Sequence, residues 1–228
     1  MEGASAAAAA AMDEEDPSQP TPEQRAAMEA LGVTHLLDPA EQQEFLRKVQ
    51  ESMEAGSEQV PVHVDPAIRA FHAAAEEGDL AGVVAALEGG ADVNATGEDG
   101  DTALHLACLY GKVDVAKELL TRGADPNVKD GDNSTPLHDC SAGGFRDIVY
   151  YLLDRGADAN AQDGDGDTPL HHACNGEHAE VADLLIQRGA SMNVKNGANR
   201  LPITMSRNPA VVQVFKQAMA MAAMAPPQ

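Results

Sequence analysis

The stretch DGDGDTPLHHACNGEHAEVADLLIQRGASMNV, residues 163–194, decides the fold of this chain. Thr168 is a good N-cap for a helix, and Pro169 suits the first helical position, where a missing N–H costs nothing. Gly189 follows an apolar run and can end a second helix in a left-handed conformation. The Asp-Gly pairs before Thr168 favour the positive φ values of a tight hairpin turn. The stretch therefore predicts a turn, a short helix, a loop and a second helix.

The same pattern recurs at a fixed spacing of 33 residues. The threonine recurs at Thr102, Thr135 and Thr168, and the histidine at His72, His105, His138 and His171. A closing Gly-Ala motif begins at Gly90, Gly123, Gly156 and Gly189. A 33-residue period with a Thr-Pro-Leu-His core resembles the ankyrin repeat. Two strings, EDGDTALH at 98–105 and GDTPLHH at 166–172, are also similar to small stand-alone ankyrin-repeat proteins of plants and algae.

The resemblance covers roughly residues 66–220 and implies an all-α ankyrin-repeat solenoid. Such a solenoid stacks helix-turn-helix units joined by β-hairpin turns. We expect about five repeats, at 66–98, 99–131, 132–164, 165–197 and 198–220. The first and last diverge from the motif, as expected of caps that lack a neighbour on one side.

The segments outside the repeats have a different composition. Residues 1–20 are Ala-rich and then acidic, which predicts disorder, and residues 221–228 predict a flexible tail. Two helix-start signals predict an N-terminal helical extension over residues 21–58. This extension could pack on the first repeat, dock on another protein, or stay disordered, and the sequence leaves the three alternatives open.

The charge of the chain restricts its partners. Its 228 residues carry a formal net charge of −22 at pH 7. Such a field disfavours nucleic acids and anionic membranes, whose phosphates attract Lys and Arg, and it favours basic partners. No apolar run is long enough to span a membrane, and we find no targeting signal. Three cysteines without a CxxC pair indicate small buried residues in a reducing compartment. We expect a monomer in the cytoplasm, or in the nucleus as well.

No residue pattern predicts catalysis, a cofactor or a metal site. The repeated histidines have, by the resemblance, a structural role in tying neighbouring turns together. Residues 163–167 resemble the start of a calcium loop, but Thr168 replaces the glycine and Cys174 the carboxylate that such a loop requires. Turn chemistry explains the three aspartates instead. We therefore predict that the protein is not an enzyme.

The resemblance implies that partners bind to the hairpin fingertips and to the concave face of the first helices. The candidate fingertip residues are Glu98, Asp99, Asp101, Asp132, Asp165 and Asp167, with Asp130 and Asp163 beside them. The candidate helix residues are Leu106, Leu109, Tyr110, Asp139, His172 and Asn175, with Ala142, Gly143, Gly176, Met205 and Asn208 at matching positions. The acids also fit ordinary turn composition. One irregularity stands out, because Glu177 replaces the glycine found at Gly111 and Gly144, which predicts a distorted interhelix loop.

These features favour a protein-interaction scaffold or adaptor that binds a basic or amphipathic segment. Two other functions stay open. One is a chaperone-like assembly or targeting factor, since the methionines at 219–224 offer pliable apolar surface. The other is a regulatory inhibitor that masks a transcription factor or kinase.

Overall fold

The computed structural model describes residues 65–224 of the chain. Its helices are α3 (Pro66–Glu77), α4 (Leu80–Glu88), α5 (Ala103–Leu109), α6 (Val113–Thr121), α7 (Pro136–Gly143), α8 (Arg146–Asp154), α9 (Pro169–Asn175), α10 (Ala179–Gln187), the 3-10 helix η1 (Pro202–Met205) and α11 (Pro209–Met224). The predicted disorder at 1–20 and the predicted helical extension at 21–58 lie outside the described residues.

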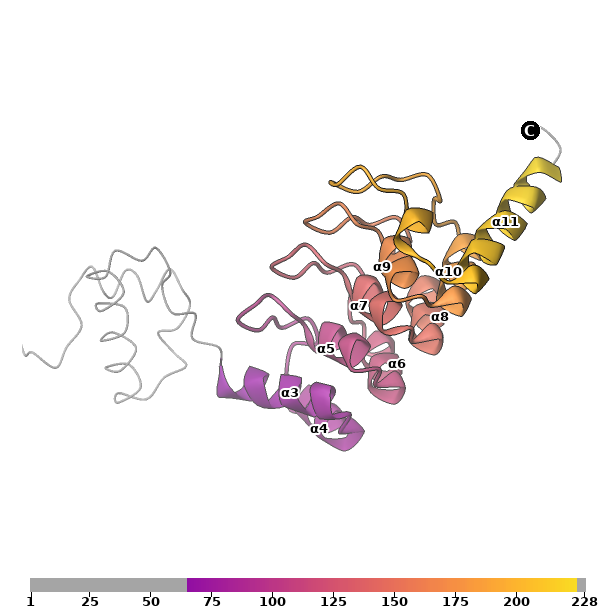
Figure 1. Cartoon of the computed structure of the whole chain (residues 1–228). Coiled ribbons are helices and arrows are strands. Elements are labelled where there is room, and N and C mark those ends of the chain that lie inside the picture. Colours follow the sequence, from indigo (N-terminus) through magenta and orange to yellow (C-terminus); the bar gives the residue numbers. More distant parts are fainter. Residues whose placement is uncertain (1–64, 225–228) are drawn as a thin grey trace, which may run out of the picture. The chain divides into compact units, whose positions relative to one another are not determined.

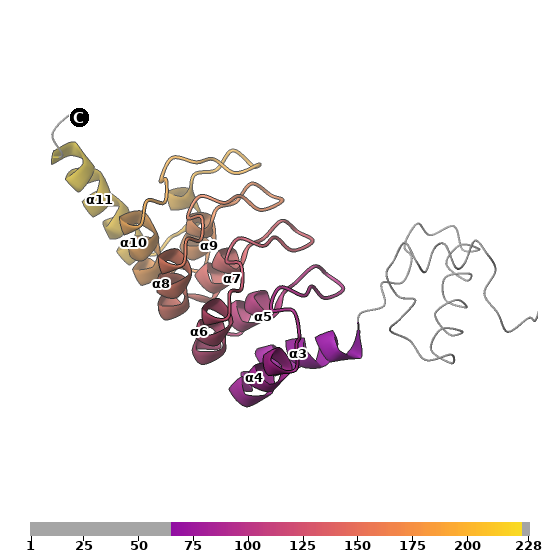
Figure 2. The same ribbon diagram turned by 180° about the vertical axis from the view of Figure 1, so that it is seen from behind.

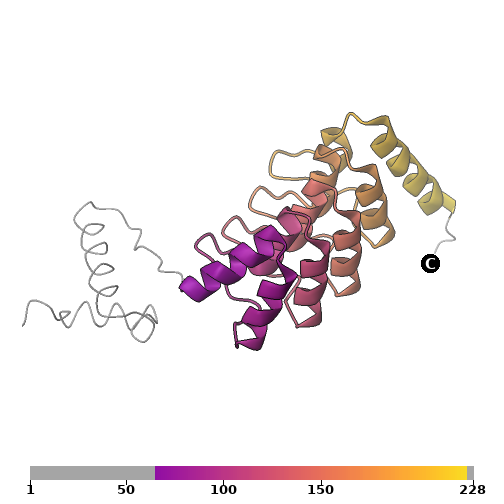
Figure 3. The same ribbon diagram turned by 90° about the horizontal axis from the view of Figure 1, so that it is seen from below.

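The helices form two parallel rows, each stacked in chain order. Helices α3, α5, α7, α9 and η1 pack on one another in one row, and α4, α6, α8, α10 and α11 make up the other. Figures 1 and 2 show the hairpin loops between units projecting together beyond the first row, with α11 at the C-terminal end. The view in Figure 3 shows α11 leaning away from the second row. The stacked all-α architecture predicted from the sequence is confirmed.

In each of the three units at 99–131, 132–164 and 165–197, the first of the two helices (α5, α7 or α9) begins after a threonine that is paired with a histidine. In the third of them, the backbone N of Thr168 donates to Nδ1 of His171 at 3.0 Å, and the Thr168 hydroxyl lies 2.9 Å from the same nitrogen. The pair satisfies a backbone N–H at the helix start that would otherwise be buried without an acceptor. Thr102 and Thr135 make the same pair with His105 and His138.

The other ring nitrogen of each histidine connects its unit to the next one. Nε2 of His138 lies 3.1 Å from the Ala161 carbonyl and 3.2 Å from the Asp167 carbonyl. Because Nδ1 accepts, Nε2 carries the proton and donates to these oxygens. Burial lowers the pKa of His138 to about 4, so the ring is neutral at physiological pH. The structural role predicted for the repeated histidines is confirmed by these contacts.

The hairpin loops are also joined to each other. We call residues 97–101, 130–134, 163–167 and 196–200 the first to fourth fingertips. The Gly131 N–H donates to the Asp99 carbonyl at 2.8 Å, and Gly164 and Gly197 repeat this bond one and two units later. A Cβ on Gly164 would lie only 2.9 Å from the Asp132 carbonyl oxygen, which explains the glycine. The fingertips therefore form a hydrogen-bonded row.

Leucines and small residues fill the core between the rows. Leu104, Leu137 and Leu170 of the first helices are fully buried, as are Leu119, Leu152 and Leu185 of the second helices. The three cysteines are also buried and unpaired, as predicted. Burial raises the pKa of Cys174 to about 12, so its thiol stays protonated and unreactive.

The interhelix loop at Glu177 is regular, so the predicted distortion is wrong. Glu177 has φ 62°, close to 66° at Gly111 and 75° at Gly144. The loop also keeps its closing hydrogen bond, from the His178 N–H to the Ala173 carbonyl at 2.9 Å. Packing and this bond hold a left-handed conformation that a glutamate alone does not favour.

The C-terminal helix is longer than the sequence indicates. Helix α11 continues through Met224, past residue 220 where we predict the last unit to end. Its first half is anchored by the buried side chains of Val211 and Phe215. None of the described helices combines the length and the apolar character needed to cross a membrane.

Candidate partner-binding site

The fingertips present a series of carboxylates separated by grooves. The groove between the first and second fingertips has a volume of about 550 Å³. It is lined by Glu98, Asp99, Gly100, Asp101, Asp130, Gly131 and Asp132. The next groove, of about 590 Å³, is lined by residues 130–134 and 163–165 together with Asp139 and His172. Asp130 and Asp132 lie on both grooves, so the second fingertip is the wall between them.

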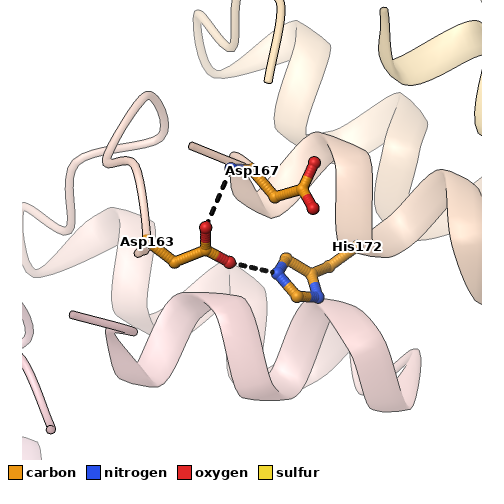
Figure 4. Close-up of side chains that lie close together, drawn as sticks. All are labelled: Asp163, Asp167 and His172. Carbon is orange, nitrogen blue, oxygen red and sulfur yellow. Dashed lines mark hydrogen bonds and ion pairs between the residues drawn. The ribbon is translucent and has the colours of Figure 1, made fainter. Parts of the chain in front are cut away.

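Asp163 organises the third fingertip. Its Oδ1 accepts hydrogen bonds from the backbone N–H groups of Asp165 and Asp167, at 3.0 and 2.8 Å. Its Oδ2 lies 2.8 Å from Nε2 of His172 on α9, as Figure 4 shows. Burial by itself would raise the pKa of Asp163, but the bonds from His172 and Asp167 outweigh burial and lower it. The carboxylate is therefore ionised, and its two oxygens are bonded to its own fingertip and to α9.

Asp163, Asp167 and His172 are the one group of described side chains that could hold a metal ion. Their ligand atoms lie within 4.8 Å of one another. Asp167 also accepts a hydrogen bond at 2.7 Å from the side chain of Asn196 in the fourth fingertip. These bonds account for the positions of both carboxylates, as the turn-chemistry interpretation of residues 163–167 predicts.

Asp139 on α7 and His172 on α9 are 33 residues apart, so they hold the same position in successive units. Asp139 is half-buried and lines the groove beside Asp130. Burial raises the pKa of Asp139 to about 8, and the charges of Asp130 and Asp101 contribute to the same shift. Asp101 shows a weaker form of this effect, because burial raises its pKa and Asp130 adds to it, although His105 opposes both.

An apolar patch lies on α5, next to these acids. Leu109 is 51% exposed and Tyr110 is 47% exposed. Leu106 lies one helical turn before Leu109 and is half-buried. The neighbouring carboxylate of Glu76 on α3 raises the pKa of Tyr110, and Asp101 contributes to the shift, so the phenol borders the acidic surface.

The candidate residues predicted from the sequence thus fall into two groups. The helix residues lie on the first-helix row, with Asn175 exposed at the end of α9, and the acids lie on the fingertips. Sequence reasoning treated Asp101, Asp130, Asp139 and Asp163 as separate charges. The structure brings Asp101, Asp130 and Asp139 together through separations of 29 and 9 residues, and Asp163, one period after Asp130, lines the same groove.

Comparison with known proteins agrees with this architecture. A family model described as ankyrin repeats in three copies matches residues 71–163 and 123–196, which together cover more than half of the chain. No curated protein matches the sequence. The matched residues contain the three threonine–histidine pairs, the first three fingertips and helices α4 to α10. The chain belongs to the ankyrin-repeat family.

Proposed function

We propose that this protein is an interaction scaffold or adaptor that binds a basic or amphipathic segment of another protein. Ankyrin repeats are generally protein–protein interaction modules, and proteins built from them are typically non-enzymatic. The observation that carries the proposal is the exposed pair Leu109 and Tyr110, which borders an acid-lined groove. Exposing two adjacent large apolar side chains to water is unfavourable, so a partner that covers them would gain binding free energy.

The charge distribution supports a basic partner. The acids are concentrated on the first three fingertips, while the fourth, with the sequence NGANR, carries one arginine and no acid. The formal charge of −22 opposes nucleic acids and anionic lipid surfaces as partners. The proposal places the protein in the cytoplasm, or also in the nucleus, as a monomer.

Affinity capture from native extract tests the proposal. The full chain carrying Leu109→Asp with Tyr110→Ala should lose the bound partner that the unchanged chain recovers, measured by quantitative mass spectrometry. A matched control is Met219→Asp with Met221→Ala on α11, where the two methionines are 63% and 73% exposed. The control should retain the partner. Equal recovery by all three proteins would place the binding surface elsewhere.

The exposed methionines favour one second candidate, a chaperone-like factor. Met219 and Met221 lie beyond the anchored part of α11, and flexible thioether side chains suit varied apolar clients. Removal of residues 216–228 should then reduce protection of an aggregating client in a light-scattering assay. Unchanged protection would count against this candidate and leave the scaffold proposal intact.

A further inference from the structure

The two half-buried carboxylates of the third fingertip, Asp163 and Asp167, each accept a hydrogen bond from a side chain of another element. Asp163 pairs with His172, nine residues later, at 2.8 Å. Asp167 accepts from Asn196, 29 residues later, at 2.7 Å. Each of these aspartates therefore has a donor side chain supplied by the repeat register.

The second fingertip lacks the imidazole partner that the third fingertip has. One period before His172 stands Asp139, so Asp130 faces another acid where Asp163 faces an imidazole. Two periods before Asn196 and Asp167 stand Asp130 and Asp101, so a second acid lies near Asp130 where Asp167 has an amide partner. Within residues 65–221, the ion pairs made by basic side chains involve Glu88, Glu98, Glu118 and Asp163, and none reaches these three aspartates. Burial raises the pKa of Asp139, and the charges of Asp130 and Asp101 raise it further.

The apolar patch lies directly beside this group of acids. Leu106 is one period before Asp139, and α5 packs against α7, so the two side chains belong to neighbouring positions of the first-helix row. Leu109 and Tyr110 follow on the exposed side of α5. Neighbouring packed helices lie about 8–10 Å apart, a distance that about three residues of an extended segment span. Charge complementarity thus selects an occupant that is cationic at one point and apolar within three residues of it.

We propose that the partner supplies the missing cation, with an arginine or lysine side chain entering between Asp130 and Asp139. An apolar side chain of the same segment packs on Leu109 and Tyr110. This inference rests on the proposed scaffold function and names the chemistry that its partner presents.

Binding of the cation is coupled to a proton. Asp130 and Asp101 of the fingertips act on Asp139 through their charges. Asp132, Asp163 and His172 line the same groove, and α5 contributes the buried Cys108 thiol, whose pKa burial raises so that it stays protonated. Since the pKa of Asp139 is about 8 in the free protein, the carboxyl must ionise before it pairs with an arginine. Affinity for an arginine segment should rise about tenfold from pH 7 to pH 9.

A phage-displayed library of random 12-residue peptides, panned on the full chain at pH 8.5, tests the proposal without a known partner. We expect recovered peptides to carry arginine or lysine within three residues of a large apolar side chain. The most enriched peptide is then synthesised with arginine and with citrulline, its uncharged isostere. Fluorescence anisotropy should show the citrulline form binding about tenfold more weakly or worse.

Substitutions in the chain locate the contact. Asp130→Asn keeps the turn, because Asn196 holds the fourth fingertip by accepting from the Arg200 N–H at 2.9 Å. Asp130→Asn and Asp139→Asn should each lower the affinity for the arginine peptide about tenfold. Asp139→Asn should also remove the pH dependence of that affinity. Asp154→Asn, an equal charge change at the exposed end of α8 in the second row, should change affinity less than about threefold. Asp139→His, which copies the pair of Asp163 and His172, should compete with the peptide cation and weaken binding.

Three outcomes would overturn the proposal. The first is recovery of peptides without basic residues, and the second is equal loss with Asp154→Asn and Asp139→Asn. The third is an affinity that does not respond to citrulline. If such peptides still lose binding with Leu109→Asp and Tyr110→Ala, the scaffold surface stands and only the cation contact is wrong. If that variant also binds normally, the proposed surface fails as well.

Discussion

At the scale of single residues, the repeat lets one position be compared in several environments. Cys108, Ser141 and Cys174 occupy the same buried position in three successive units. Among the described residues, the Ser141 hydroxyl is the buried side-chain polar atom without a hydrogen-bond partner. A buried hydroxyl that loses its bond to water without replacing it destabilises the folded state.

Replacement of Ser141 by cysteine should therefore stabilise the protein. The larger sulfur copies the neighbouring units and removes the unsatisfied oxygen, and we expect a gain of about 1 kcal/mol in the free energy of unfolding. Ser141→Ala should be neutral or mildly stabilising. Urea denaturation at pH 7 measures both. A loss above about 1 kcal/mol for Ser141→Ala would show that the hydroxyl has a partner.

The stability of Asp139→Asn should depend on pH in a defined direction. The folded-state pKa of Asp139, about 8, lies above its ordinary value of 3.8. The protonated carboxyl therefore contributes to the stability of the folded state. This contribution is fully present below pH 3.8 and is lost as the pH rises from there through 8. The advantage of Asp139→Asn over the unchanged chain should be larger at pH 9 than at pH 5, by about 4 kcal/mol for the full shift and by less once solvent screens this half-buried carboxyl. Thermal melts across that range measure it, with Asp165→Asn as the flat control, and a constant difference would contradict the shift.

At the scale of elements, the amino-acid type at a position predicted where helices begin but not the conformation of one interhelix loop. The helix starts at Thr102, Thr135 and Thr168 were predictable, because a threonine cap and a first-turn proline or alanine act locally. The regular conformation of the loop at Glu177 was not predictable in this way. Its conformation depends on the bond from the His178 N–H to the Ala173 carbonyl, which belongs to the packed unit and overrides the preference of glutamate.

Glu177→Gly should relieve the remaining strain. A left-handed φ of 62° is unfavourable for glutamate and free of penalty for glycine. The greater freedom of glycine in the unfolded chain offsets part of this gain, so we expect stabilisation of about 0.5–1 kcal/mol by chemical denaturation. The reverse change, Gly144→Ala, should destabilise, because a Cβ there would collide with the His178 ring. Destabilisation by Glu177→Gly would mean that the glutamate side chain has a stabilising role in the loop.

At the scale of the whole molecule, the 33-residue period predicted the stacked architecture, since each unit can bury its apolar face only against a neighbour. The sequence predicted which residues make up the candidate surface, but it did not predict which of their side chains lie next to each other. Asp130 and Asp139 read as two ordinary acids in the sequence. Only the stacked register shows that they lie together where Asp163 and His172 are hydrogen-bonded.

The central claim is that one surface, made of the first and second fingertips and the first helices α5 and α7, binds the partner. Hydrogen–deuterium exchange of the full chain, with and without the partner recovered by affinity capture, tests it most directly. The account predicts slowed exchange in peptides covering residues 97–110 and 130–143, and unchanged exchange over 179–224. Protection confined to α6, α8, α10 or α11 would contradict it.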